Sequence, residues 1–119
     1  DWVVVNTNGR GFYRTRYDSG LLQSLSGVMQ TSLTELERFG IVSDTWASVR
    51  AGMSPLTDFV ELCASMKDEN DPDVWAAMLA PIGYTTRIAD DESARTIEAY
   101  AASLANPALH RVGCLQQKC

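Results

Sequence analysis

The chain has 119 residues, of which 45% are hydrophobic and 21% charged, a composition typical of a globular domain. A formal net charge of −5 and a pI of about 4.7 leave no electrostatic footprint for nucleic acid and exclude DNA or RNA binding as a main function. No apolar stretch approaches the roughly 20 residues of a membrane helix, and no secretory signal opens the sequence, so we expect a soluble chain.

Three cysteines are present, which is an odd number and does not suggest a disulfide framework. Cys63 falls on an apolar helical stripe, so we expect an inert thiol in the core. Cys114 and Cys119 lie in a tail without clear periodicity. Unpaired thiols favour a reducing compartment, and we expect a cytoplasmic location.

The first 18 residues contain two runs of strand-forming residues, 2–6 and 12–17. Gly9 and Gly11 lie between them and can supply the positive φ angles of a turn, which predicts a β-hairpin. A lone hairpin is marginal in water. Its strands must therefore rest on the following helices or belong to a sheet outside this chain.

The second run alternates aromatic and basic side chains. Because Arg14 stands beside aromatic residues, we expect it to stack on them or to pair with a carboxylate such as Asp18 or Glu37. Either contact would fix the junction between the hairpin and the first helix. A contact with a peptide carboxylate is the alternative interpretation.

After Asp18 the apolar period changes from two to 3.6 residues, which indicates helices. One face of a first helix contains Leu21, Leu22, Leu25, Val28 and Met29. The sequence Ser32–Glu35 fits a capping box at the start of a second helix. We expect the apolar stripe of that helix to consist of Leu36, Phe39, Val42, Trp46, Val49 and Met53.

Two further helix starts contain proline. Ser54 followed by Pro55 predicts the N-cap and first turn of a third helix. Asp71 and Pro72 repeat this signature for a fourth helix, which we expect Pro81 to kink or to end. The apolar stripes of these two helices contain Leu56, Phe59, Val60 and Cys63, then Val74, Trp75, Met78, Leu79 and Ile82.

A fifth helix is expected from Asp91 onward and should stop near Asn106 and Pro107, because the residue before proline avoids helical angles. Short connections between consecutive amphipathic helices favour antiparallel neighbours. The predicted fold is therefore mainly α, with an N-terminal β-hairpin followed by about five amphipathic helices stacked as antiparallel pairs, in the manner of HEAT repeats or an α–α superhelix.

No residue has the pattern of a catalytic, cofactor or metal site. His110 is the only histidine, which excludes an HExxH zinc site in this chain. The spacing of His110, Cys114 and Cys119 matches no structural zinc pattern, and neither a Gly-x-Ser-x-Gly elbow nor a phosphate loop is present. The acidic groups at 68–73 and 90–92 are interpreted as solvated first-turn carboxylates rather than as a calcium site.

Several stretches resemble, in order, one enzyme family. Residues 2–6, 11–14 and 17–18 resemble the passage from the β-sandwich into the helical C-terminal (ERAP-like) domain of aminopeptidase N-type zinc enzymes. Residues 37–46 and 51–52 resemble the following helix, especially of bacterial members, and residues 71–75 and 107–109 resemble later helix ends. The positions that carry the resemblance, all expected to be structural, are Trp2, Asn6, Gly11, Phe12, Tyr13, Arg14, Tyr17, Asp18, Arg38, Asp44, Trp46, Gly52 and Trp75.

The resemblance divides the chain into residues 1–18, the end of the parent's β-sandwich, and residues 19–119, part of its helical domain, which together form one structural unit. It implies a parent enzyme that removes N-terminal residues from peptides, using zinc held by an HExxH helix. None of those catalytic motifs occurs in this chain. At Cys114 the chain also departs from the family, which tends to have an aromatic residue there.

We therefore expect a non-catalytic piece of a zinc aminopeptidase that caps the parent's active site and shapes access to it. Its expected partners are the catalytic and β-sandwich parts of the parent and, through them, a peptide substrate. Unpaired edges of the hairpin would favour self-association. A free-standing helical protein-interaction module is the alternative, and an independent peptidase would require zinc-dependent release of an aminoacyl reporter by the chain alone.

Overall fold

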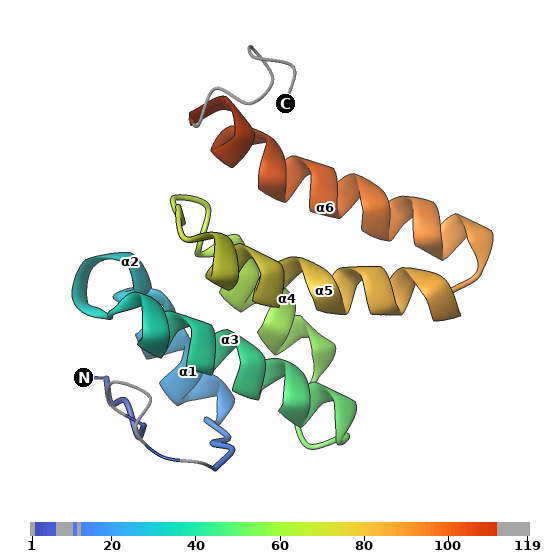
Figure 1. Cartoon of the computed structure of the whole chain (residues 1–119). Coiled ribbons are helices and arrows are strands. Elements are labelled where there is room, and N and C mark those ends of the chain that lie inside the picture. Colours follow the sequence, from blue (N-terminus) through green and yellow to red (C-terminus); the bar gives the residue numbers. More distant parts are fainter. Residues whose placement is uncertain (1, 7–10, 12, 112–119) are drawn as a thin grey trace.

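The structure is a computed structural model that describes residues 2–6, 11 and 13–111, with side chains through residue 106. Within this part it contains helices but no strand (Figure 1). The prediction of successive helices after Asp18 is confirmed for the described residues 19–111. The helices are α1 (Ser19–Ser26), α2 (Met29–Ser32), α3 (Glu35–Arg50), α4 (Leu56–Ala64), α5 (Pro72–Ile88) and α6 (Asp91–Arg111).

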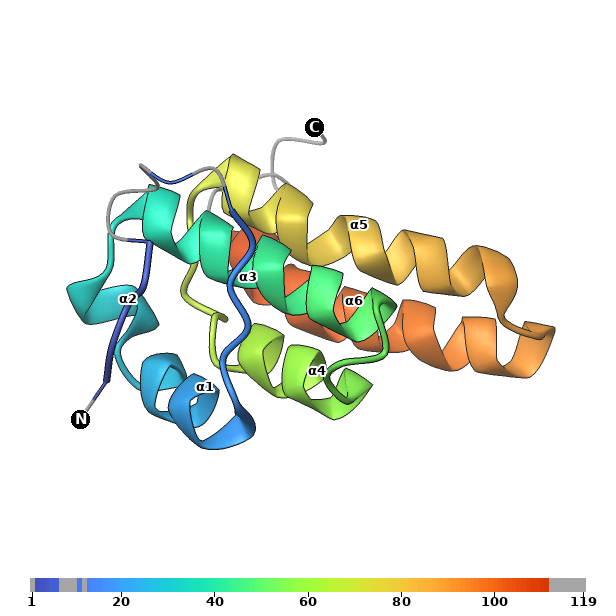
Figure 2. The same ribbon diagram turned by 90° about the horizontal axis from the view of Figure 1, so that it is seen from below.

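Two antiparallel helical hairpins, α3–α4 and α5–α6, form most of the molecule (Figures 1 and 2). Helix α3 packs against both α4 and α5, α5 packs against α6, and α1 packs against α4. The N-terminal segment consists of the described residues 2–6, 11 and 13–18, and Figure 2 shows residues 13–18 crossing α3. The pairing of neighbouring helices agrees with the prediction, while a HEAT-like superhelix stays a prediction.

The β-hairpin predicted for the first 18 residues has no strand in its described part, residues 2–6, 11 and 13–18. The turn expected at Gly9 and the side chain of Phe12 lie outside the described residues. Instead of a strand ladder, side chains hold the segment: Asn6 Nδ2 donates to the carbonyl of Gly11 at 3.2 Å, and Asn6 Oδ1 accepts the Gly11 N–H at 2.7 Å.

The predicted capping box at Ser32–Glu35 is wrong by two residues. Ser32 belongs to the short helix α2, so the chain becomes extended only at Leu33 and Thr34. Thr34 Oγ1 accepts the Glu37 N–H at 3.2 Å, and the Glu37 carboxylate accepts the Thr34 N–H at 3.0 Å. This reciprocal pair of bonds satisfies two free amides and begins α3 at Glu35.

The other helix starts gave mixed outcomes. Asp71 caps α5 through the amides of Asp73 and Val74, as predicted. The N-cap of α4 is Pro55 rather than Ser54, and it makes no side-chain cap bond. The prediction that Ser54 is the N-cap is wrong, because Ser54 lies in the loop that follows α3.

A single first helix over residues 21–29 is also wrong, since α1 ends at Ser26 and α2 begins at Met29. Between them Val28 has φ −123° and ψ 4°, outside the helical region. The predicted apolar face is wrong at Leu21, which is exposed, and correct at Leu22, Leu25 and Met29, which are buried in the core. The break turns the chain while keeping these side chains on the same side.

Neither proline ends its helix. Helix α5 continues through Pro81 to Ile88, and α6 continues through Pro107 to Arg111. A proline within a helix removes one hydrogen bond and costs about 3 kcal/mol. Helix α5 is packed against α3 on one side and α6 on the other, so burial of its apolar residues outweighs that cost.

The core joins all the helices through their apolar faces. Its buried members are Tyr17, Leu22, Leu25, Met29, Leu33, Ile41, Val42, Phe59, Leu62, Cys63, Met66, Val74, Met78 and Leu104. The stripe predicted for α3 is correct at Val42 and wrong at Leu36, Phe39 and Met53, which are exposed. The buried face of α3 includes polar residues because α4, α5 and the N-terminal segment surround it, and periodicity of apolar residues cannot reveal such a face.

Candidate functional site

The described residues contain no group of three His, Cys, Asp or Glu side chains that could hold a metal ion. Cys63 is buried, and burial raises the pKa of its thiol to about 12. The thiol is therefore protonated at neutral pH and a poor nucleophile, as predicted. The side chains of His110, Cys114 and Cys119 lie outside the described residues.

The candidate functional site is instead a surface made by the N-terminal segment and the exposed side of α3. Two tyrosines fix the segment at Val5. The Val5 N–H donates to the hydroxyl of Tyr17 at 3.1 Å, and the hydroxyl of Tyr13 donates to the Val5 carbonyl at 3.3 Å. Tyr17 is itself a core residue, so the segment is tied to the interior. Burial raises the pKa of the Tyr17 hydroxyl.

The segment is also anchored to the middle of α3. Arg14 Nη1 donates to Asp44 Oδ1 at 2.9 Å and to the hydroxyl of Ser43 at 2.7 Å. The N–H of Thr15 donates to Asp44 Oδ2 at 3.2 Å. The prediction that an arginine of this run pairs with a carboxylate is confirmed, but the partner is Asp44. The examples Asp18 and Glu37 are wrong, because Asp18 caps α1 and Glu37 belongs to the capping box of α3.

These anchors present apolar side chains to the outside. Trp2, Val3, Val5 and Tyr13 are all exposed in the segment. On α3, Leu36 is 54% and Phe39 39% exposed. Tyr13 and Phe39 line one hollow, and Leu36 and Phe39 line another. Exposed apolar side chains that lie together are typical of an interaction surface. We call these six residues the α3 surface.

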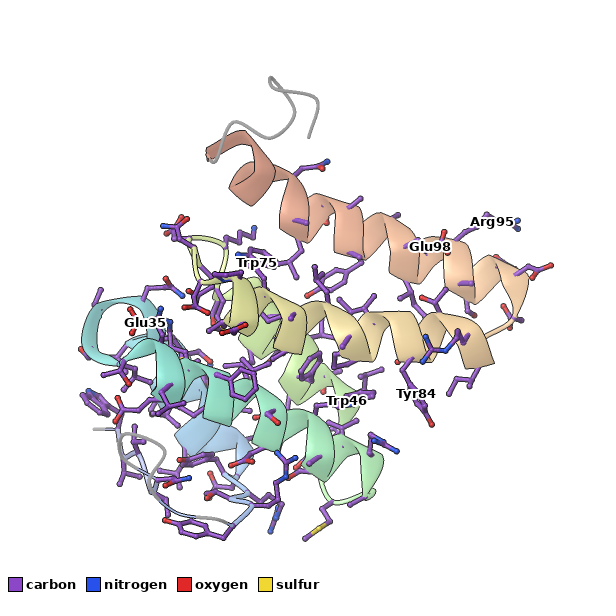
Figure 3. All side chains as sticks on the ribbon, in the orientation of Figure 1. Glu35, Trp46, Trp75, Tyr84, Arg95 and Glu98 are labelled. Carbon is purple, nitrogen blue, oxygen red and sulfur yellow. The ribbon has the colours of Figure 1, made fainter. Side chains whose placement is uncertain are left out.

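Carboxylates border the α3 surface where two helices begin. Glu35, Asp71 and Asp73 line a shallow hollow together with Leu36 and Phe39. Figure 3 shows Glu35 at the start of α3. These carboxylates occupy the first turns or the cap of α3 and α5, where helix dipoles stabilise negative charge.

A buried ion pair stabilises the start of α3. Arg38 Nε lies 2.7 Å from Glu69 Oε1, and Arg38 Nη2 donates to Glu69 Oε2 at 3.0 Å. The remaining nitrogen of the guanidinium, Nη1, donates to the Leu33 carbonyl at 2.8 Å. The pair therefore connects the start of α3 with the loop between α4 and α5.

Glu69 is surrounded by hydrogen-bond donors. The N–H groups of Asn70 and Asp71 donate to its Oε2 at 3.1 and 3.0 Å, and Gln30 Nε2 donates to its Oε1 at 3.3 Å. Burial alone would raise the pKa of this carboxyl, but the bonds from Arg38, the backbone and Gln30 together lower it. Glu69 is thus ionised and 1% exposed, which corrects the prediction of a solvated carboxylate.

The structure places most residues of the family resemblance around these two anchors. Arg14 and Asp44 form one anchor and Arg38 belongs to the other, whose loop also accepts the Trp75 indole N–H at the Glu69 carbonyl, 2.7 Å away. Gly11 is pressed against Tyr13, since a Cβ at this position would lie 2.0 Å from the ring.

The remaining resemblance positions are spread along the chain. Gly52 has φ +75°, a conformation that favours glycine, just after α3 ends. Trp46 is partly buried against Phe59, and Trp2 is exposed. These thirteen positions do not converge on one pocket, and their role as family positions stays a prediction.

Glu69 is the residue that sequence reasoning missed. A weak signal exists at its partner, because Arg38 is the only basic residue between Arg16 and Arg50. An isolated cation in a helix with a strong apolar pattern often pairs with a distant carboxylate. Nothing in the sequence, however, shows which of the many carboxylates it meets.

The described part of the chain is a helical domain with exposed apolar side chains on the N-terminal segment and on α3. Comparison with known families is more specific: the model of the ERAP1-like C-terminal domain matches residues 2–118. The chain therefore belongs to the ERAP1-like C-terminal domain family. This confirms the resemblance to the C-terminal domain of aminopeptidases, while a bacterial type stays a prediction.

The names of related proteins agree with this family assignment. Aminopeptidase M1 of Arabidopsis thaliana is 34% identical over 66% of this chain and 9% of its own length. Aminopeptidase M1-A of Oryza sativa subsp. japonica is 28% identical over 94% of this chain and 13% of its own length. The Tricorn protease-interacting factor F2 of Thermoplasma acidophilum is 33% identical over 60% of this chain and 9% of its own length. No solved structure gives a significant match.

The chain thus spans about a tenth of the length of these relatives, 9%, 13% and 9% respectively. No described helix is long and apolar enough to cross a membrane. The first two of these relatives are aminopeptidases by name, and the chain corresponds to a C-terminal domain of such proteins.

Proposed function

We propose that this chain is the first part of the helical C-terminal domain of a zinc aminopeptidase and has no catalytic residue of its own. The parent would remove N-terminal residues from peptides with a zinc held outside this chain. The helical part would pack against the catalytic and β-sandwich parts and shape the access of peptides to the active site. The names of the relatives and the family match support this proposal.

The observation that carries the proposal is the α3 surface. Its apolar side chains are exposed even though two tyrosine hydroxyls and the Arg14–Asp44 anchor hold the segment on the helices. A segment that only needed to be soluble would not require so many fixed contacts beneath exposed apolar residues. An apolar surface on a rigid support is suited to a permanent contact within a larger protein.

The first experiment reads the coding frame around this chain and measures the activity of its full product. We expect an HExxH segment upstream in the same frame, zinc-dependent release of an aminoacyl reporter by the full product, and no release by the 119-residue chain. Release by the isolated chain, or a full product without the zinc motif, would refute the proposal.

The second experiment tests the surface in the full-length product. Leu36→Asp would place a charge at the proposed contact, and we expect at least a tenfold loss of activity together with faster proteolysis around this helix. The matched control is Ile88→Asp, because Ile88 is 70% exposed and lies at the far end of α5 from this surface. Equal effects of both substitutions would contradict a contact at Leu36.

The isolated chain provides a further test of the same surface. We expect it to self-associate through the exposed residues of the segment, because apolar groups meant for the parent would be left in water. Sedimentation velocity should show association that weakens in a Trp2→Ser and Val3→Ser double variant. A monomer at all concentrations would refute the proposed self-association.

A free-standing helical interaction module is the second candidate, and a start codon directly before Asp1 would favour it. We also propose a cytoplasmic location, and the support for it is the unpaired thiol of Cys63. Fractionation of cells that produce the full product tests this location.

A further inference from the structure

A separate apolar cavity lies between the two helical hairpins, away from the α3 surface. Its volume is about 170 Å³. The aromatic part of its wall comes from Trp46, Phe59 and Tyr100, and aliphatic side chains such as Val60, Ile82 and Ile97 complete it. Residues of α3, α4, α5 and α6 thus contribute to one space.

Aromatic contacts and one hydrogen bond hold this space open. The Tyr100 hydroxyl on α6 donates to the Val60 carbonyl on α4 at 3.2 Å, so the length of the tyrosine side chain separates the two helices at this point. Trp46 is fixed from two sides, by Phe59 at 5.4 Å and by Tyr84 at 6.1 Å between ring centroids. Figure 3 shows Trp46 and Tyr84 close together between α3 and α5.

The chemistry of the wall selects uncharged molecules. No charged side chain lines the cavity. The two threonines at its edge already use their hydroxyl protons, because Thr85 Oγ1 donates to the Pro81 carbonyl at 2.9 Å and Thr96 Oγ1 donates to the Glu92 carbonyl at 3.1 Å. Their oxygens can still accept a hydrogen bond, but a charged ligand would lose its hydration without gaining a partner of opposite charge.

The size of the cavity fits a single ring. A closed cavity of roughly 150 Å³ with a similar lining stays dry and binds benzene; the present space has a comparable volume but is open to solvent on one side. Aromatic walls add offset and edge-to-face contacts with a bound ring. The mouth is accessible, since Val60 and Leu56 are partly exposed.

We propose that this cavity is a binding site for a small, uncharged molecule with one aromatic ring. The site is independent of any zinc chemistry and of the α3 surface. Binding would stabilise the packing of the α5–α6 hairpin on the α3–α4 hairpin, because the ligand contacts both.

The experiment titrates toluene into the ¹⁵N-labelled 119-residue chain and follows its three tryptophan indole signals. We expect a saturable shift at Trp46 and none at Trp2 or Trp75, whose indole is bonded to the Glu69 carbonyl outside the cavity. The melting temperature should rise with the logarithm of toluene concentration above the dissociation constant. Benzoate, whose carboxylate would meet no charged side chain in the lining, should bind at least tenfold more weakly.

Matched variants locate the site. Ile97→Phe fills the cavity and should weaken toluene binding at least tenfold, whereas Ile88→Phe makes the same change at an exposed position and should leave binding unchanged. Should Ile97→Phe fail to fold, Val60→Phe closes the mouth from α4 and has the same expected effect.

Three results would overturn the proposal: no saturable shift at Trp46, equal shifts at all three indoles, or unchanged binding in a folded variant that fills the cavity. A Trp46 signal that moves with protein concentration in the absence of toluene would also refute it, because a second copy of the chain would then occupy the space.

Discussion

The N-terminal segment and the helical body are each joined to α3 by an arginine–carboxylate pair, but the two pairs differ in their surroundings. The Arg14–Asp44 distance is 2.9 Å with side-chain exposures of 65% and 11%, and the Arg38–Glu69 distance is 2.7 Å with exposures of 11% and 1%. The distances are nearly equal. Exposure therefore decides how much each pair contributes to the free energy of unfolding, because water screens the first pair and is excluded from the second.

The two regions also differ in how their contacts are organised. In the body, Glu69 accepts hydrogen bonds from three separate parts of the chain, including Gln30 and the start of α5. In the segment, single hydrogen bonds at Val5, Arg14 and Thr15 follow one another along the chain. Loss of one bond should therefore loosen the segment locally, whereas loss of Glu69 should destabilise the whole fold.

Removal of Glu69 should give the largest effect. In Glu69→Ala the Arg38 guanidinium and several amides lose their buried partner, and we expect a loss of about 3–5 kcal/mol in the free energy of unfolding. Urea denaturation followed by circular dichroism measures it. The control is Glu35→Ala, an exposed carboxylate at the same end of α3, which should change stability by less than about 0.5 kcal/mol. Similar values for both variants would show that the buried pair adds little.

The pH dependence should separate the same pair from the rest of the molecule. The folded pKa of Glu69 is lowered, so its contribution is fully present above the unfolded pKa of about 4.3 and is lost as pH falls through the folded value. The stability difference between wild type and Glu69→Gln should be constant between neutral pH and about pH 5 and should shrink below pH 4.3. A difference that is independent of pH would contradict an ionised Glu69 in the folded state.

These two regions also show what the sequence could and could not reveal. Helix starts such as Asp71–Pro72 were predictable, because a cap and its amides are within four residues of each other. The Arg38–Glu69 pair joins residues 31 positions apart, and Glu69 stands among other carboxylates with no local feature that distinguishes it. Long-range partners of this kind depend on how the helices dock, which local patterns do not determine.

In the segment, Tyr17→Phe should have a moderate effect. The Val5 N–H would lose its acceptor, which costs about 1 kcal/mol, and residues near Val5 should exchange their amide protons faster. Hydrogen exchange with mass spectrometry measures this change. The exposed Tyr13→Phe removes a donor at the same residue and should have a smaller effect. Unchanged exchange in Tyr17→Phe would mean that the hydroxyl does not hold the segment.

Arg14→Ala should have the smallest effect. We expect a loss on the order of 0.5 kcal/mol or less, because the guanidinium is largely exposed. Most of this loss should disappear in about 1 M salt, where the Debye length is about 3 Å. A loss above about 2 kcal/mol would mean that exposure does not distinguish the two pairs, and Arg16→Ala serves as a control for the removal of a nearby charge.

The site was less predictable than the fold. The family resemblance pointed to Arg14, Arg38 and Asp44 as structural positions, yet their partners became visible only in the folded chain. The stripe predicted for α3 was wrong at Leu36 and Phe39, which are exposed, and the proposed contact surface would carry the same apolar residues as a core. Apolar periodicity cannot distinguish burial within a domain from burial against a neighbouring one.

The Arg38–Glu69 pair has a consequence for the order of folding. It closes a loop of chain that contains most of α3 and all of α4, so both helices must be docked before the guanidinium and carboxylate can meet. We therefore expect this contact to form late, after the rate-limiting step. We expect Glu69→Ala to accelerate unfolding by nearly the full loss of stability and to leave the refolding rate almost unchanged. The pair would then slow unfolding and so determine the lifetime of the folded state.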